Sequence, residues 1–155
     1  METEFIVETV AGCELFKGIP EETAGKIVSL CRPGSFDEGY IIFQQGDFGE
    51  SLYIIGEGLI ILERSIDLAT RKGTVTIDSL GKGRVLGSWS TLLGEPHILM
   101  SSAICRKAST VLEIKGKDLR GMMISDKNLG FAIMEKFCLL LRNRLRAAYV
   151  AMEKI

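Results

Sequence analysis

The sequence has 155 residues, with 19 basic and 20 acidic side chains and a net charge of −1. This length is typical of one domain that buries a core without disulfides or metals, and the balanced charge gives no electrostatic basis for whole-surface binding to nucleic acid. The first eight residues lack the basic start of a signal peptide, and no apolar run reaches the ~18 residues that span a bilayer. We therefore expect a single cytoplasmic domain, residues 1–155, with no membrane segment.

The four cysteines, at positions 13, 31, 105 and 138, lie far apart and form no CxxC pair. This spacing predicts thiols packed in the core of a protein from a reducing compartment. It does not favour a zinc site or a redox motif.

Residues 1–34 are expected to form a helical lead-in. Pro20 suits the first position of a helix, and Glu21 and Glu22 suit its first turn. We expect the Pro33-Gly34 pair to end this helix. The segment predicts structure and, by itself, no activity.

Residues 35–114 change to short β-like runs separated by glycine-rich turns. The expected strands are residues 36–45, 51–55, 59–65, 73–80, 84–86, 101–106 and 109–114, with a polar hairpin loop at 67–73. Many short strands at this spacing are typical of an antiparallel double-sheet jelly roll, also called a cupin-like or double-stranded β-helix fold. The predicted class is mainly β, with N-terminal helices and a long C-terminal helix.

Residues 83–105 read as strand, glycine turn, one helical turn, proline-marked loop and strand. Gly87 allows a tight turn, and Ser88 or Ser90 is expected to cap the helical turn at 89–93. Pro96 is expected to end that turn. The free N–H groups at the start of such a turn can bind an anion or a small polar ligand.

Two segments resemble the cyclic-nucleotide-binding domain superfamily. In residues 42–58, Gly46-Asp47, Gly49 and Gly58 flank the apolar run 52–55 as in the strand–turn–strand signature of that superfamily. Residues 83–105 resemble the phosphate-binding cassette of catabolite-activator-type regulators and of kinase regulatory subunits. The resemblance implies the jelly-roll fold and a ligand pocket at the cassette.

The cassette departs from the family at two positions that hold the ligand. The family has Gly-Glu-Leu at the turn, where the acid binds the ribose 2′-hydroxyl, and an Arg after the loop that pairs with the cyclic phosphate. Here Ser88 and Trp89 follow Gly87, and no Arg lies between Pro96 and Ala103. A charge-assisted hydrogen bond contributes roughly 1.5–3 kcal/mol, so we expect cyclic AMP binding to be weaker by about two powers of ten or more.

The resemblance therefore implies a pocket for a cyclic nucleotide or another small polar ligand, with an altered preference. Trp89 either fills the space left by the missing contacts or stacks on a flat ligand. The candidate ligand-binding residues are Leu86, Gly87, Ser88, Trp89, Ser90, Ser101, Ser102 and Ala103.

Residues 115–155 are expected to be helical, with a short helix at 115–123, a cap at Ser125-Asp126 and a long helix at 127–154. The long helix carries apolar residues in steps of three and four, which is a heptad seam. We expect this seam to form a homodimer interface, made by Phe131, Met134, Cys138, Leu141, Leu145, Ala148 and Met152. In the alternative, both faces of the helix pack on the chain's own N-terminal helices.

A second face of the long helix, with Ile133, Phe137 and Leu140, is expected to lie on the β-roll. The arginines at positions 142, 144 and 146 are expected to form a solvated or salt-bridged face. In catabolite-activator-type regulators such a helix leads into a helix-turn-helix. No such segment follows within these 155 residues, so we expect no direct DNA binding.

Catalysis has little support in the residue inventory. His97 is the single histidine, so the multi-histidine metal site of jelly-roll enzymes cannot be assembled, and no nucleophile elbow is present. Haem ligation by His97 stays open as a minor alternative.

We expect no enzymatic activity and no certain cofactor. The leading hypothesis is a ligand-sensing regulatory module that signals through its C-terminal helix; the alternative is a ligand-free dimerisation or adaptor domain.

Overall fold

The structure is a computed structural model that describes residues 2–87 and 89–155. Its helices are α1 (Glu2–Gly12), α2 (Glu21–Val28), α3 (Ser90–Leu93), α4 (Gly116–Ser125) and α5 (Lys127–Met152). Its strands are β1 (Arg32–Phe36), β2 (Ile41–Phe43), β3 (Phe48–Gly49), β4 (Ser51–Glu57), β5 (Ile60–Asp67), β6 (Lys72–Leu80), β7 (Val85–Gly87), β8 (His97–Ile98), β9 (Ser102–Cys105) and β10 (Ser109–Lys115).

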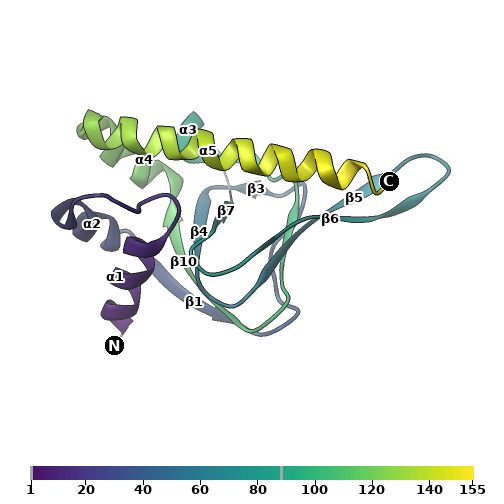
Figure 1. Cartoon of the computed structure of the whole chain (residues 1–155), viewed down its shortest axis with the longest axis horizontal. Helices are drawn as coiled ribbons and strands as arrows, with labels where there is room; N and C mark the ends of the chain where they lie inside the picture. Colours follow the sequence, from purple (N-terminus) through teal and green to yellow (C-terminus); the bar gives the residue numbers. More distant parts are fainter. Residues whose placement is uncertain (1, 88) are drawn as a thin grey trace.

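The strands build a jelly roll of antiparallel sheets (Figure 1). One sheet has the order β1-β10-β4-β7, the other has β2-β9-β5-β6, and β3 pairs with β8 in a short ribbon. Apolar side chains from both four-stranded sheets meet in a core inside the roll, among them Ile55, Ile60, Leu86 and Val111. The predicted fold class, mainly β with flanking helices, is confirmed.

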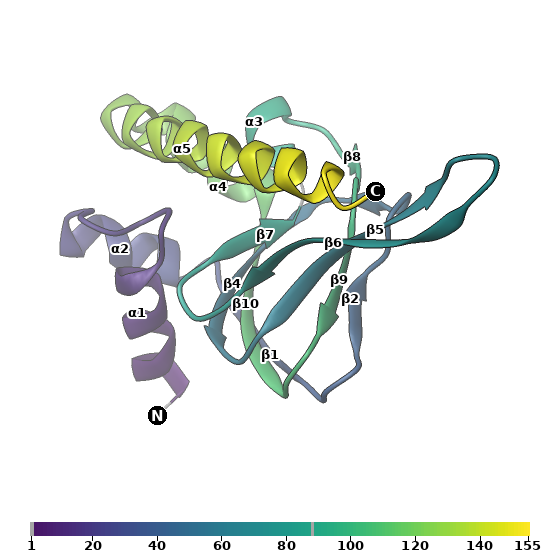
Figure 2. The same ribbon diagram turned by 45° about the vertical axis from the view of Figure 1, so that its right-hand side comes forward.

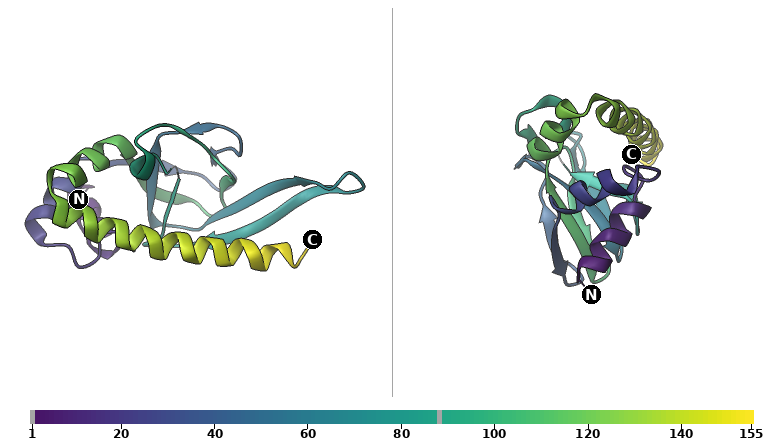
Figure 3. Two further views of the ribbon diagram at one scale, coloured as in Figure 1. Left: turned by 90° about the horizontal axis from the view of Figure 1, so that it is seen from above. Right: turned by 90° about the vertical axis from the view of Figure 1, so that its left-hand side faces the viewer.

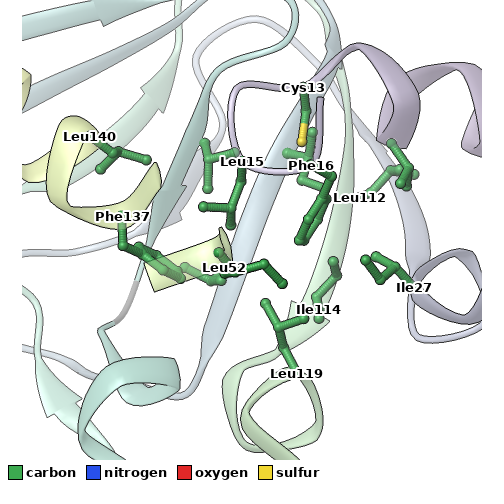
Figure 4. Packing of buried hydrophobic residues seen from close by; sticks show 14 of the residues in the cluster. Cys13, Leu15, Phe16, Ile27, Leu52, Leu112, Ile114, Leu119, Phe137 and Leu140 are labelled. Atoms are coloured by element: carbon green, nitrogen blue, oxygen red, sulfur yellow. The ribbon is translucent and has the colours of Figure 1, made fainter. Parts of the chain in front are cut away.

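A second core joins the roll to the helices at its end (Figure 4). Phe16 and Ile27 from the N-terminal segment pack with Leu52 of β4, Leu119 of α4 and Phe137 of α5. This core places α1 and α2 at one end of the roll, while α5 runs along it toward the β5–β6 hairpin (Figures 2 and 3). The helices are therefore anchored to the same β-framework that positions the cassette.

The predicted lead-in and first strand need correction. Residues 36–45 are not one strand, because β1 ends at Phe36 and β2 begins at Ile41. The rings of Phe36 and Tyr40 stack at 4.4 Å and close the turn between them. Pro33 and Gly34 do not stop a helix, because α2 already ends at Val28. Pro33 is tolerated inside β1 because β1 is an edge strand.

The long C-terminal helix agrees with the prediction closely. The side chain of Asp126 caps α5 by accepting a hydrogen bond from the N–H of Leu129 at 3.2 Å. Ile133, Phe137 and Leu140 are buried against the roll and its helices, as the second apolar face predicted. The predicted dimer seam faces outward over much of its length, and Phe131 is 70% exposed.

The two faces of α5 give a stability prediction. Ile133 is fully buried and Leu139 is 48% exposed on the same helix. We expect Ile133→Ala to lower the free energy of unfolding by about 2–5 kcal/mol, because it removes packed apolar groups and leaves a cavity. Leu139→Ala should change it by no more than about 0.5 kcal/mol. Urea denaturation of both variants measures the difference, and equal losses would contradict this placement of the helix.

Candidate functional site: a cavity closed by the C-terminal helix

A cavity of about 270 Å³ lies between the roll, the loop after α3 and α5. The roll contributes Phe43, Leu62, Ile77, Leu86 and Gly87. The cassette and its loop contribute Trp89, His97, Ile98, Leu99, Met100 and Ser101, and α5 contributes Leu141, Arg144, Leu145 and Ala148. The wall is mostly apolar, and no lining residue in the described part of the chain carries a carboxylate.

The structure brings four of the predicted ligand-binding residues to this cavity, namely Leu86, Gly87, Trp89 and Ser101. Gly87 has a φ of +122°, and a Cβ there would lie 2.4 Å from the carbonyl oxygen of Ser51, so only glycine fits. This close approach holds the start of the cassette against β4. Ser88 lies outside the described residues.

The other predicted residues are turned elsewhere. The hydroxyl of Ser90 donates to the carbonyl of Glu50 at 3.0 Å, and the hydroxyl of Ser102 accepts from the N–H of Gln45 at 2.9 Å. Ala103 is buried in the core of the roll, paired with Leu62. These three residues stabilise the frame of the cassette and do not line the cavity.

The single helical turn α3 ends differently from the prediction. Trp89 is its N-cap residue, so Ser90 is the first helical residue and not the cap. The turn stops at Gly94, which has a φ of +73° and donates its N–H to the carbonyl of Ser90 at 2.7 Å. Pro96 follows after the chain has already left the helix. A glycine with left-handed backbone dihedral angles commonly ends a helix, and Gly94 lies two residues before Pro96.

Most of the lining residues were not among the predicted ligand-binding residues, and Arg144 is the one with a permanent charge among those described. Its Nη2 donates to the carbonyl of Val85 at 2.6 Å, and its Nη1 lies 3.6 Å from Oδ2 of Asp78. The side chain is only 14% exposed. Burial lowers the pKa of Arg144, and the nearby Glu14 and Asp78 oppose that shift. A guanidinium keeps its proton in proteins, so Arg144 is a cation in the wall.

Arg144 belongs to a network that ties α5 to the roll and the N-terminal segment. Arg84 contacts Asp78 at 3.8 Å through Nη2 and Glu14 at 3.2 Å through Nε. Glu14 also accepts the N–H of Val85 at 2.6 Å. The positions of α5, β6, β7 and the segment after α1 are therefore linked through four charged side chains.

The arginines at 142, 144 and 146 are solvated or salt-bridged as predicted, but they do not share one face of α5. Arg144 follows Leu140 by one helical turn and faces the roll, whereas Arg142 and Arg146 are exposed. The signal was present in the sequence, because residues 133, 137, 140 and 144 repeat at helical spacing. Arg144 lies on the same buried face of α5 as Leu140 and is the charged residue toward the C-terminal end of that face.

Trp89 connects the cavity to α5. Its ring packs edge-on against Phe137 at a centroid distance of 6.4 Å, and the same side chain lines the cavity. Of the two alternatives for Trp89, filling matches this contact, since part of the ring joins the core between the roll and the helices. The side chain of Trp89 therefore contacts both the cavity and the long helix α5.

The cysteines are all free thiols. Burial raises the pKa of Cys13 to about 11 and that of Cys31 to about 12, so both stay protonated and unreactive near neutral pH. Cys105 is also buried, but Cys138 is exposed on α5, so the prediction of core thiols is wrong for it. Within the described part of the chain, no cluster of three or more His, Cys, Asp or Glu side chains is arranged to hold a metal ion.

Comparison with known proteins identifies the family. The family model described as cyclic nucleotide-binding domain matches residues 33–126, which is more than half of the chain. The chain belongs to this family. The matched region runs from β1 to the junction of α4 and α5, so it contains the roll and the whole cassette.

Individual relatives agree with this assignment. The cyclic AMP receptor protein of Thermus thermophilus is 32% identical over 81 residues, which are 52% of this chain and 36% of that protein. The match thus spans about a third of that relative. The solved catabolite activator protein of Thermus thermophilus is 26% identical with a TM-score of 0.70, over 90% of this chain and 62% of that one.

A cyclic nucleotide-binding domain from Methylobacillus flagellatus is 21% identical with a TM-score of 0.79, over 99% of this chain and 84% of that one. At this identity the likeness shows the shared fold, which includes the long C-terminal helix. Among residues 2–87 and 89–155, no helix has both the length and the hydropathy of a bilayer-spanning segment.

In this cyclic nucleotide-binding domain, a guanidinium reaches the cavity from α5 and not from the loop after α3. We expect Arg144→Met to lower the free energy of unfolding by roughly 1–3 kcal/mol, because it removes the bond to Val85 and leaves that carbonyl without its donor. Arg142→Met, at an exposed position on the same helix, serves as the matched control. Denaturant titration compares the two, and an Arg144→Met protein as stable as the control would contradict the role of the network.

Proposed function

We propose that the chain is a regulatory domain that senses a small ligand in this cavity and signals through α5. The observation that carries the proposal is that α5 itself supplies part of the wall, through Leu141, Arg144, Leu145 and Ala148. A ligand that contacts these side chains binds one placement of the helix better than another. Occupancy and helix position are then thermodynamically coupled.

The ligand preference is proposed to differ from that of a cassette with both anchors. The described lining offers no carboxylate to a ribose hydroxyl. Its guanidinium, Arg144, is engaged by Asp78 and by the carbonyl of Val85. A cyclic phosphate in this cavity would lose its hydration and would have to share Arg144 with Asp78. Cyclic nucleotides are therefore proposed to bind weakly.

The output is proposed to pass through a homodimer formed by the exposed seam of α5. Phe131, Met134 and Cys138 are exposed, and Leu145 is both exposed on the seam and part of the cavity wall. Association of two copies along this seam would bury these apolar side chains. The partner helix and the ligand would then share residues of α5.

A ligand-free dimerisation or adaptor domain is the second candidate. The exposed seam favours it equally, because the seam needs a partner whether or not a ligand binds. The two candidates differ in one respect, which is whether occupancy of the cavity changes the association of α5. Neither candidate requires catalysis, and the chain is proposed to act by binding alone.

We expect calorimetric titration with cyclic AMP and cyclic GMP to give affinities at least about two powers of ten weaker than those of the Thermus thermophilus cyclic AMP receptor protein measured in parallel. The reason is the loss of the two charge-assisted contacts that the family cassette makes. Comparable affinities would show that other residues replace the anchors and would overturn the altered preference.

We expect Cys138 to form an intermolecular disulfide under mild oxidation, because it occupies a core position of the seam and two such positions face each other in a parallel pair of helices. Cys13 and Cys105 are buried and should not react. Non-reducing electrophoresis measures the product, and Cys138→Ser should abolish it.

The control places the thiol off the seam. Asn143 is exposed on the opposite side of α5, so the double variant Cys138→Ser with Asn143→Cys keeps one exposed thiol on the same helix. It should cross-link far more slowly than the unmodified chain. Equal rates, or a monomer by sedimentation at high concentration, would contradict the parallel dimer.

A further inference from the structure

We propose that the cavity takes an uncharged, mainly apolar small molecule, of the chemical class of a fused aromatic or a short hydrocarbon. This inference rests on the proposed function and names the ligand class of that site. A volume of about 270 Å³ lies just below the usual range for small-molecule pockets, roughly 300–1,000 Å³, so the ligand should be small.

The roll, the loop after α3 and α5 each contribute apolar side chains to the wall of the cavity. Leu62 and Leu86 come from the roll, Leu99 comes from the loop, and Leu141 and Leu145 come from α5. An apolar molecule placed among them would remove its own surface and theirs from water, which is the main source of affinity in such a cavity. A nucleotide would instead place its sugar hydroxyls and phosphate against hydrocarbon.

The charged group in the wall already has an acidic neighbour, although its buried Nη1 donates no hydrogen bond to any described residue. Asp78 lies 3.6 Å from Nη1 of Arg144 and also 3.8 Å from Nη2 of Arg84, so the acid is shared by two guanidinium groups. An anionic ligand would have to draw Arg144 away from Asp78 and from the carbonyl of Val85. A neutral acceptor atom could use Nη1 of Arg144, which donates to no described residue, and leave Asp78 in place, whereas an anion would have to compete with that carboxylate.

Three N–H groups of the cassette's helical turn already donate within the turn. The N–H groups of Leu92 and Leu93 both donate to the carbonyl of Trp89, at 2.9 and 3.1 Å, and that of Gly94 donates to Ser90. The polar side chains left in the described lining are His97 and Ser101, both half-buried in the loop after α3. They suffice for one or two hydrogen bonds to a neutral polar atom of the ligand.

Trp89 supplies a reporter for the test. It is the single tryptophan of the sequence, and it lines the cavity. A bromine atom in contact with the indole ring quenches its fluorescence by the heavy-atom effect. A brominated neutral aromatic such as 1-bromonaphthalene therefore reports occupancy of this cavity in the full chain.

We expect 1-bromonaphthalene to quench Trp89 in a saturable manner. The anionic 1-naphthoate should displace it only at concentrations about tenfold higher or more, because a carboxylate loses hydration in an apolar site. Cyclic AMP should not displace it at any concentration that leaves the protein folded. Tighter binding of 1-naphthoate than of the neutral compound, or displacement by cyclic AMP at low concentration, would overturn the proposal.

A pair of substitutions on α5 tests the location. Ala148 lines the cavity, and Ala147 lies beside a separate hollow that also borders Asn143 and Val150. Ala148→Phe should fill the cavity and remove the saturable quenching, whereas Ala147→Phe should leave it unchanged. Ser101→Phe fills the cavity from the opposite wall and should give the same loss if Ala148→Phe fails to fold. Saturable quenching that survives both filling variants would overturn the proposal.

Cross-linking at Cys138 separates the ligand class from the signalling function. Quenching without any change in the cross-linking rate would support the ligand class and contradict signalling through α5. A change in rate with cyclic AMP but no quenching by 1-bromonaphthalene would support signalling and overturn the ligand class. A change in both readouts, lost together in Ser101→Phe, which lines the cavity but lies outside the α5 seam, and kept in Ala147→Phe, supports the two proposals at once.

Discussion

The burial of one face of α5 on the β-roll is the constraint on which the rest of the structure depends. Ile133, Phe137 and Leu140 fix the first half of the helix through apolar packing. Arg144 fixes the second half through polar contacts with β6 and β7. Because the helix is anchored at both places, its remaining surface is divided between the cavity and solvent. One 26-residue element thus forms a core face, a wall of the cavity and an exposed seam.

The two anchors differ in kind, and the difference matters for motion. Apolar packing in the first half is close-fitting, so shifting it would open voids and cost packing energy. The charged contacts of the second half can exchange partners more readily, since Asp78 already interacts with both Arg84 and Arg144. The part of α5 that borders the cavity is therefore the part held by the more adaptable interactions. This arrangement suits a domain in which a bound molecule repositions a helix.

The sequence predicted the roll and the long helix because both depend on periodic patterns over many residues. It failed where a single local interaction decided the outcome. The ribbon of β3 and β8 has two residues on each side, which is too short for alternation to reveal, and its pairing of Phe48 with Ile98 joins distant segments. The end of α3 was assigned to Pro96, but Gly94 acts two residues earlier. Arg144 was grouped with its neighbours in sequence, although its helical position places it with Leu140 on the buried face.

The edge strand β1 has a consequence for how copies of the chain can meet. An edge strand normally offers a row of unpaired backbone donors to any other strand. Pro33 has no N–H to offer, and it is the second residue of β1, directly opposite Leu112 of β10. A further strand added along this border would find its hydrogen-bonding pattern interrupted. Sheet-to-sheet polymerisation through the β1 edge is thereby discouraged.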